Sequence, residues 1–124
     1  ICVDALNGAP GIYSARFSGE NATDEQNNQH LLSLLKNEVN RKAKYFCALV
    51  YLRHANDPEP IIACGSWQGE IIDTARGSHG FGYDPYFYIP EYGMTVAELD
   101  PALKNKISHR ALAMQEMLNK MKHE

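Results

Sequence analysis

The distribution of apolar residues along the chain predicts five β-strands. The expected strands cover residues 1–6, 43–52, 61–66, 70–74 and 86–89. The second is apolar on both of its alternating faces, a pattern that favours a central strand covered on both sides. The third and fourth flank Trp67-Gln68-Gly69, around which they are expected to form a hairpin.

Two other regions show helical periodicity. Thr23, with Gln26 three residues later, forms a capping box that predicts a helix reaching about Glu38. The expected apolar face of this helix consists of Leu31, Leu32, Leu34 and Leu35. A second helix is expected to begin at Pro101, which suits the first helical position, with Asp100 as its cap. Its apolar residues, at spacings of three and four, are Ile107, Ala111, Met114, Leu118 and Met121.

Lys104 and His109 can converge on one ligand only if Ser108 interrupts this last helix. In one continuous helix Lys104 and His109 would differ by about 140° around the axis, so they would not converge on one ligand. A break at Ser108, with its hydroxyl as the cap of a new helix, places His109 and Arg110 in a first turn. Free backbone N–H groups there favour electron-rich ligand atoms. The alternative is one unbroken helix with His109 on its solvent-exposed face.

These elements predict a single α/β domain over residues 1–124, with a mixed, twisted sheet flanked by helices. A hydrophobic content of 44% and a charged content of 22% are ordinary for a globular domain. No apolar run approaches the roughly 18 residues of a membrane span, and no signal-peptide pattern opens the chain, so we expect a cytoplasmic protein. The three cysteines lack a Cys-x-x-Cys spacing and are expected to be buried thiols.

The charge and the scattered histidines limit the possible partners. A net charge of −3 argues against a nucleic-acid-binding surface. The histidines and cysteines show no spacing typical of a zinc site, so no metal-binding residue is predicted. Asp4 suits a strand-end residue that bonds its own turn better than a metal ligand. Arg16 is open to three roles: a phosphate contact, a subunit contact or a surface pair.

The most informative stretch is Gly80-Phe81-Gly82-Tyr83-Asp84-Pro85, with Lys104 and Ser108-His109-Arg110 downstream. Glycines on both sides of Phe81 allow a sharp turn that presents a flat ring. The ring, the carboxylate of Asp84 and the downstream donors together could hold a heterocycle by its face and its edge. The alternative is a glycine-rich turn that leads into an aromatic strand, followed by an unrelated helix.

Two other interpretations of this region are disfavoured. The glycines of residues 77–82 do not open a helix, as a dinucleotide-binding loop requires, because Asp84-Pro85 leads into an aromatic strand. Residues 81–92 are rich in aromatic side chains, which could stack on single-stranded nucleic acid. That stretch contains no Lys or Arg, so the basic groove of such a protein is missing. Most of these rings are expected in the core, with Phe81 as the exception.

Phe81-Gly82-Tyr83-Asp84-Pro85 followed by Ser108-His109-Arg110 closely resembles the inosine/xanthosine triphosphate pyrophosphatase family. The segment from Val3 to Arg16, which contains Asn7-Gly8-Ala9-Pro10-Gly11 and Tyr13-Ser14-Ala15-Arg16, resembles a second motif of the same family. The resemblance implies a homodimeric enzyme of the inosine triphosphatase fold that uses Mg²⁺ and hydrolyses dITP, ITP and XTP to the monophosphate and pyrophosphate. It also implies the substrate-binding residues: Phe81 stacks on the base, Gly82, Tyr83 and Asp84 complete the pocket, and Lys104, Ser108, His109 and Arg110 contact the base edge.

The same resemblance predicts what the chain lacks. The family's phosphate-binding loop, its metal-binding glutamate and an Asp-Asp-Ser-Gly motif with the general-base aspartate would precede Ile1. We therefore expect the chain to correspond to roughly the C-terminal two-thirds of such an enzyme, with the N-terminal part missing and no catalytic or metal-binding residue of its own. The alternatives are a purine-nucleotide-binding fragment without activity and a structural remnant.

Overall fold

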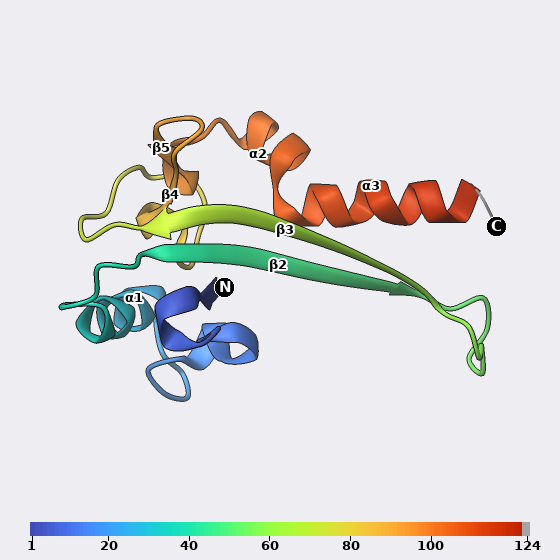
Figure 1. The fold of residues 1–124 in the computed structure, drawn as a ribbon, viewed down its shortest axis with the longest axis horizontal. Coiled ribbons are helices and arrows are strands. Elements are labelled where there is room, and N and C mark those ends of the chain that lie inside the picture. Colours follow the sequence, from blue (N-terminus) through green and yellow to red (C-terminus); the bar gives the residue numbers. More distant parts are fainter. Residues whose placement is uncertain (123–124) are drawn as a thin grey trace. The chain divides into compact units, whose positions relative to one another are not determined.

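The computed structural model describes residues 1–122 and divides the chain into two compact units. The first comprises residues 1–44 and 68–101, and the second comprises residues 45–67 and the chain from residue 102 onward. Two long strands, β2 (Lys42–Tyr51) and β3 (Ile61–Ile71), contribute to both units (Figure 1). A single domain over residues 1–124 stays a prediction, and its last two residues lie outside the described chain.

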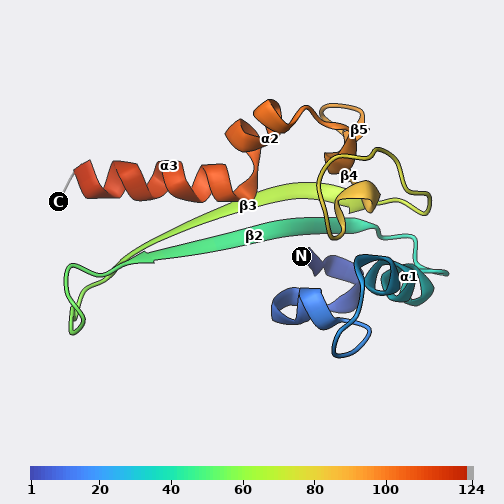
Figure 2. The ribbon, with the colours of Figure 1, turned by 180° about the vertical axis from the view of Figure 1, so that it is seen from behind.

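The five strands form one sheet in the order β1-β2-β3-β4-β5. The short strands are β1 (Cys2–Val3), β4 (Phe87–Ile89) and β5 (Met94–Thr95). Val3 pairs with Ala43, Ile71 with Phe87, and Ile89 with Met94, each in antiparallel register. The views from front and back show β2 and β3 side by side (Figures 1 and 2). The α/β class is confirmed, but the sheet is antiparallel rather than mixed, because the chain reverses between sheet neighbours instead of crossing over.

The first unit begins with a shorter strand than predicted. Only Cys2 and Val3 are extended, and Asp4–Leu6 forms a 3₁₀ turn. Asn7 and Gly8 follow with positive φ angles of 55° and 90°, so the turn signal was correct. This reversal lets the Val3 amide donate to the Ala9 carbonyl at 3.0 Å, which ends the strand at Val3.

The first helix, α1 (Asp24–Leu34), starts where the capping box predicted. The Gln26 amide donates to Thr23 Oγ1 at 3.1 Å, and the Thr23 amide donates to Gln26 Oε1 at 2.8 Å. The helix ends four residues before the predicted Glu38, because Leu35 already leaves helical geometry while its amide still bonds Leu31. Leu31 and Leu35 are buried, whereas Leu34 is exposed. With Val3, Phe87 and Leu99, these two leucines are among the most deeply buried side chains of the first unit.

The predicted hairpin around Trp67-Gln68-Gly69 is wrong, because β3 is one continuous strand. Its side chains alternate strictly, with Ala63, Gly65, Trp67, Gly69 and Ile71 on the buried face. Gly69 is needed for close packing, since an added Cβ would lie 2.5 Å from the Phe87 ring. Glycine therefore marks close approach here, not a turn.

The C-terminal region, which belongs to the second unit from residue 102 onward, forms two helices, α2 (Pro101–Ile107) and α3 (His109–Lys122). Ser108 separates them, and its Oγ accepts a hydrogen bond from the Ala111 amide at 3.2 Å. The predicted break is therefore confirmed, and the single continuous helix is excluded. Pro101 is the first residue of α2, as expected.

The predicted apolar face of the last helix is wrong. Ala113 and Met117 are its buried residues, whereas Met114, Leu118 and Met121 are exposed. The cause lies in β3: a Cβ on Gly65 would come 2.5 Å from the Ala113 amide nitrogen, so the α3 backbone lies directly on this glycine. Only glycine therefore fits at position 65 without displacing the α3 backbone.

One face of β2 in the second unit is covered, and the other is exposed. Tyr45 stacks on His109 with ring centroids 5.0 Å apart, and its ring centroid is 6.5 Å from that of Trp67. On the opposite face Phe46 and Val50 are 51% and 60% exposed. A strand covered on both sides is therefore not what the described chain shows.

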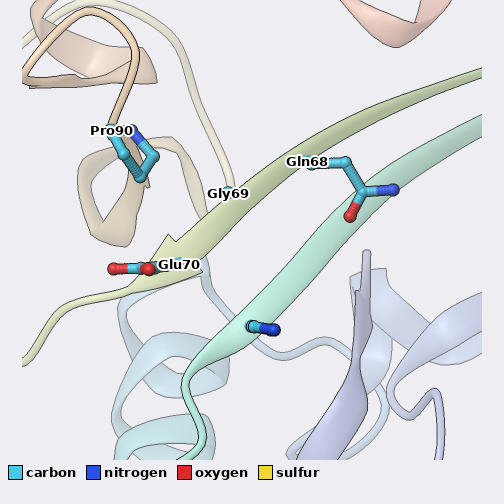
Figure 3. Close-up of a pocket in the computed structure, with 5 residues that line it drawn as sticks. Gln68, Gly69, Glu70 and Pro90 are labelled. Atoms are coloured by element: carbon cyan, nitrogen blue, oxygen red, sulfur yellow. The ribbon is translucent and has the colours of Figure 1, made fainter.

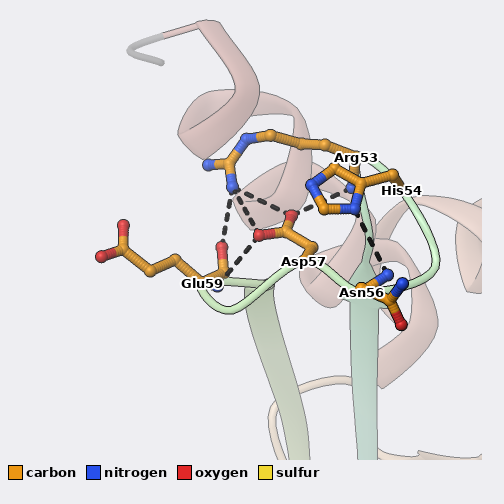
Figure 4. Close-up of polar contacts among 5 residues, drawn as sticks. All are labelled: Arg53, His54, Asn56, Asp57 and Glu59. Carbon is orange, nitrogen blue, oxygen red and sulfur yellow. Dashed lines mark hydrogen bonds and ion pairs between the residues drawn. The ribbon is translucent and has the colours of Figure 1, made fainter.

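The turn between β2 and β3 is organised by Asp57 (Figure 4). Its carboxylate accepts hydrogen bonds from the amides of Arg53 and Glu59 and from the Arg53 guanidinium, at 2.9–3.1 Å. The two amide bonds, reinforced by the Arg53 charge, lower the pKa of Asp57. The Arg53 guanidinium also donates to the Glu59 carbonyl at 2.9 Å, which fixes this reversal.

Candidate nucleotide-base site

The loop of residues 80–84 is closed by a hydrogen bond within itself. The Phe81 amide donates to Asp84 Oδ2 at 3.0 Å, and the Asp84 amide donates to the Phe81 carbonyl at 3.2 Å. Gly80 has a φ of 83°, and a Cβ there would collide with the Asp84 carboxylate. Asp84 is only 5% exposed, so its carboxylate shapes the loop from inside.

Helix α1 holds the same loop from outside. The Gly82 amide donates to Asp24 Oδ2 at 2.9 Å, and Asn28 Nδ2 donates to the Gly82 carbonyl at 3.0 Å. The backbone N–H and the backbone C=O of Gly82 thus both form hydrogen bonds with α1. Sequence reasoning missed Asp24 and Asn28, because the capping box located the start of the helix but gave no sign of what lies beside it.

Tyr83 joins the two sequence motifs. Its hydroxyl donates to the Ser14 carbonyl at 2.6 Å, and Ser14 belongs to the 3₁₀ helix Gly11–Arg16. Burial raises the pKa of Tyr83 to about 12, and the nearby Asp24 carboxylate adds to the shift. The phenol therefore stays protonated and donates at all physiological pH values. Segments far apart in the sequence meet at this bond.

Phe81 differs from its aromatic neighbours. Its side chain is 66% exposed, whereas Tyr83, Tyr86 and Phe87 are buried. Three of the six rings of this stretch are therefore core residues, and Phe81 is the most exposed ring, although Tyr92 is also exposed. The loop presents a flat apolar surface to solvent.

The remaining predicted site residues lie in the second unit. Lys104 is half-buried on α2, and His109 and Arg110 occupy the first turn of α3. Ser108 is buried and caps that helix, and the His109 ring lies against Tyr45. The Phe81 loop and these residues belong to different units, so their convergence on one ligand stays a prediction.

An open hollow of about 280 Å³ lies elsewhere in the first unit (Figure 3). It is lined by Lys42, Gln68, Gly69, Glu70 and Pro90. None of the predicted base-binding residues belongs to it. The hollow and the Phe81 loop are therefore separate features.

Other candidate residues have ordinary surroundings. The guanidinium of Arg16 lies 5.3 Å from the Tyr13 ring centroid, an exposed cation–π pair. Asp4 is exposed, and its carbonyl accepts from the Asn7 amide at 3.1 Å. The three cysteines are free thiols, but none is buried, so their predicted burial is wrong. Cys2 and Cys47 are partly exposed, and Cys64 is exposed on the outer face of β3.

Two absences were established for residues 1–122. No three His, Cys, Asp or Glu side chains in this part of the chain are placed to hold a metal ion. The described helices are too short or too polar to span a bilayer.

Comparison with known proteins identifies the family. A dITP/XTP pyrophosphatase of Chromobacterium violaceum is 54% identical over 122 residues, covering 98% of this chain and 62% of the relative. The solved structure of a HAM1 protein from Coxiella burnetii superposes with a TM-score of 0.94 at 42% identity, covering 99% of this chain and 64% of that protein. The Ham1 protein of Staphylococcus aureus gives a TM-score of 0.91 at 42% identity, covering 98% of this chain and 62% of that protein.

The chain thus spans about three-fifths of the length of these relatives. The resemblance inferred from the two motifs is confirmed by the names of the relatives and by their folds. The Ham1 family profile matches residues 1–120, and the chain therefore belongs to the Ham1 family.

Proposed function

We propose that this chain provides the base-binding part of a nucleoside triphosphate pyrophosphatase that hydrolyses dITP, ITP and XTP to the monophosphate and pyrophosphate. The observation that carries the proposal is the exposed Phe81 ring on a loop whose amides donate to Asp24 and Asp84 and whose Gly82 carbonyl accepts from Asn28. The relatives' name, dITP/XTP pyrophosphatase, favours an enzyme over a module that only binds nucleotides.

In this proposal Phe81 stacks on the purine, with Gly82, Tyr83 and Asp84 forming the loop around it. Lys104, Ser108, His109 and Arg110 face the edge of the base. Hypoxanthine and xanthine carry an oxygen at C6, which accepts hydrogen bonds from cationic donors. Adenine carries an amino group there, so its donor would face the donors of the protein and leave buried groups unpaired.

The hydrolysis breaks the bond between the α-phosphate and the bridging oxygen of pyrophosphate, and a water oxygen takes its place on phosphorus. Mg²⁺, which the family resemblance implies, would supply charge neutralisation at the phosphates. The residues of this chain do not fit such a site, since the described part holds no cluster of metal-binding side chains. No step is therefore assigned to a metal held by this chain.

The proposal also covers the cellular compartment and the oligomeric state of the enzyme. The three free thiols agree with a reducing compartment such as the cytoplasm. A homodimer is proposed from the family resemblance, and sedimentation velocity at micromolar concentration measures it directly. A monomer over that range contradicts this part of the proposal without affecting base binding.

The decisive experiment compares ITP, XTP and ATP as ligands and substrates. We expect ITP and XTP to bind at least about tenfold more tightly than ATP, as a donor–acceptor mismatch costs on the order of 1–3 kcal/mol. Arg110→Ala should reduce this preference, whereas Lys106→Ala, an exposed cation on the preceding helix, should leave it unchanged. Equal affinity and equal turnover of ITP and ATP by the unmodified protein would overturn the assignment.

A further inference from the structure

The Phe81 side chain is 66% exposed, so packing of the ring accounts for only part of its placement. The conformation of the loop backbone also sets where the ring lies. That backbone is permissive, since Gly80 and Gly82 have positive φ angles of 83° and 62°. Glycines on both sides of one residue allow many conformations unless hydrogen bonds select one.

Hydrogen bonds to two carboxylates select the conformation of this loop, and one carboxylate lies in the loop while the other lies on α1. Asp84 belongs to the loop, so its bond to the Phe81 amide closes the loop without fixing it to the rest of the unit. Asp24 belongs to α1, and its bond to the Gly82 amide ties the residue after Phe81 to a helix. The Asp24 acceptor is charged, which makes this bond stronger than a neutral one.

The geometry of α1 supports this hydrogen bond between Asp24 and the loop. Asp24 and Asn28 are four residues apart on α1, so they share one face of the helix. Asp24 accepts from the amide of Gly82, and Asn28 donates to its carbonyl. Asp24 is also the first residue of α1, a position where a carboxylate is stabilised by the helix dipole.

We propose that Asp24 is a positioning residue: through the Gly82 amide it fixes the Phe81 loop in the conformation that stacks on the purine base. This inference rests on the proposed function for the identity of the ligand. Asp24 acts through the loop and does not itself contact the base.

The first test is amide hydrogen exchange of residues 80–84, which needs no ligand. Asp24→Ala should raise exchange of the Gly82 amide about tenfold or more, because its only acceptor among the described residues is removed. Glu25→Ala is the matched control: it removes the neighbouring first-turn carboxylate, whose bond is to Gln29 rather than to the loop. Unchanged exchange in Asp24→Ala overturns the proposal.

The second test is a double-mutant cycle for ITP binding, measured by calorimetry. Asp24→Ala should weaken binding about threefold to tenfold, the effect of one lost hydrogen bond. In a Phe81→Ala background the same change should weaken binding less than twofold, because the ring that Asp24 positions is gone. Equal effects in both backgrounds overturn the proposal, since Asp24 would then act elsewhere.

The two tests separate this inference from the proposed function. If the unmodified chain binds no inosine or xanthosine nucleotide, the proposed function fails, and exchange at Gly82 still decides whether Asp24 fixes the loop. Should binding be present and exchange unchanged, the positioning role alone fails. Asp24→Asn, which keeps an acceptor oxygen, should restore most of the protection and of the ITP affinity.

Discussion

Phe81 and Phe87 are six residues apart and have opposite surroundings, the first 66% exposed and the second fully buried. Phe87→Ala should therefore lower the free energy of unfolding by about 3–5 kcal/mol, as expected for a buried phenylalanine. Phe81→Ala should change it by less than about 1 kcal/mol and instead weaken ITP binding by about 1–3 kcal/mol through lost stacking. Urea unfolding and calorimetry measure the two effects. A large loss of stability with normal ITP affinity in Phe81→Ala would make Phe81 a core residue.

Asn28 gives a second prediction. It is 4% exposed, and its Oδ1 accepts no hydrogen bond from any described residue, although its Nδ2 donates to Gly82. A buried acceptor without a partner costs about 1–3 kcal/mol. Asn28→Leu, of similar shape, removes this cost together with one neutral hydrogen bond. We expect an unchanged or higher melting temperature and at most a small loss of ITP affinity; a drop of several degrees would show that the Gly82 bond dominates.

The elements that were predicted correctly have local causes. The capping box at Thr23 and the break at Ser108 each depend on side-chain bonds within three residues, so neighbouring sequence determines them. The wrong elements depend on distant partners. Gly69 suggested a turn in the sequence, yet Gly69 makes room for Phe87 and Gly65 makes room for α3, each more than 15 residues away.

The residues of the candidate site also fall into those that the nearby sequence suggests and those that depend on distant partners. Phe81, His109 and Arg110 could be proposed from the sequence, because the motif that contains their ring, imidazole and guanidinium resembles a known family; their roles at the base stay predictions. Asp24 and Asn28 could not be proposed, since nothing near them in the chain indicates that α1 lies beside Gly82. Only the tertiary fold shows which carboxylate holds the loop.

Gly65 provides the test of how α3 is placed. Gly65→Ala introduces a Cβ that meets the α3 backbone at Ala113, and backbone atoms cannot move aside as a side chain can. Overpacking of this kind should destabilise the chain by about 1–3 kcal/mol. Ser66→Ala, on the exposed face of the same strand, should change stability by less than about 0.5 kcal/mol. If both variants unfold at the same urea concentration, α3 does not lie on this glycine.

Two side chains of α3 also form hydrogen bonds with backbone groups of β3. Glu116 Oε2 accepts from the Cys64 amide at 2.8 Å, and Lys120 Nζ donates to the Ile62 carbonyl at 2.6 Å. Alternate residues of a strand direct their backbone groups to one side, so the two side chains satisfy one side of β3 as a neighbouring strand would. Such cover keeps a strand edge from pairing with another chain.

This contact predicts a pH dependence. The Cys64 amide, followed by Lys120, lowers the pKa of Glu116 below its usual 4.5. A carboxyl with a depressed pKa in the folded state stabilises the protein above 4.5, and that contribution is lost as the pH falls through the folded pKa. The unmodified chain should therefore lose more stability than Glu116→Gln between pH 6 and about pH 3. Parallel losses in urea unfolding would show that Glu116 does not bond the strand in solution.

Considered as one molecule, the chain carries the proposed base-recognition residues but little to attract a polyphosphate. Its net charge is −3, and its described residues offer no metal-binding cluster. Base contacts bind ground state and transition state alike, so they contribute affinity without contributing to the reaction at phosphorus. Affinity for the ligand should therefore depend on the base more than on the number of phosphates.

The last prediction compares IMP with ITP, with Mg²⁺ present and after its removal by EDTA. If the base carries the affinity, IMP and ITP should bind this chain with dissociation constants within about tenfold of each other, a difference of at most about 1.4 kcal/mol. Chelation of Mg²⁺ should change neither dissociation constant by more than about threefold. AMP is the control and should bind at least about tenfold more weakly than IMP, because it differs only at the base. Strong dependence of ITP affinity on Mg²⁺ would contradict the prediction, because the chain would then hold the triphosphate through a metal that its own carboxylates bind.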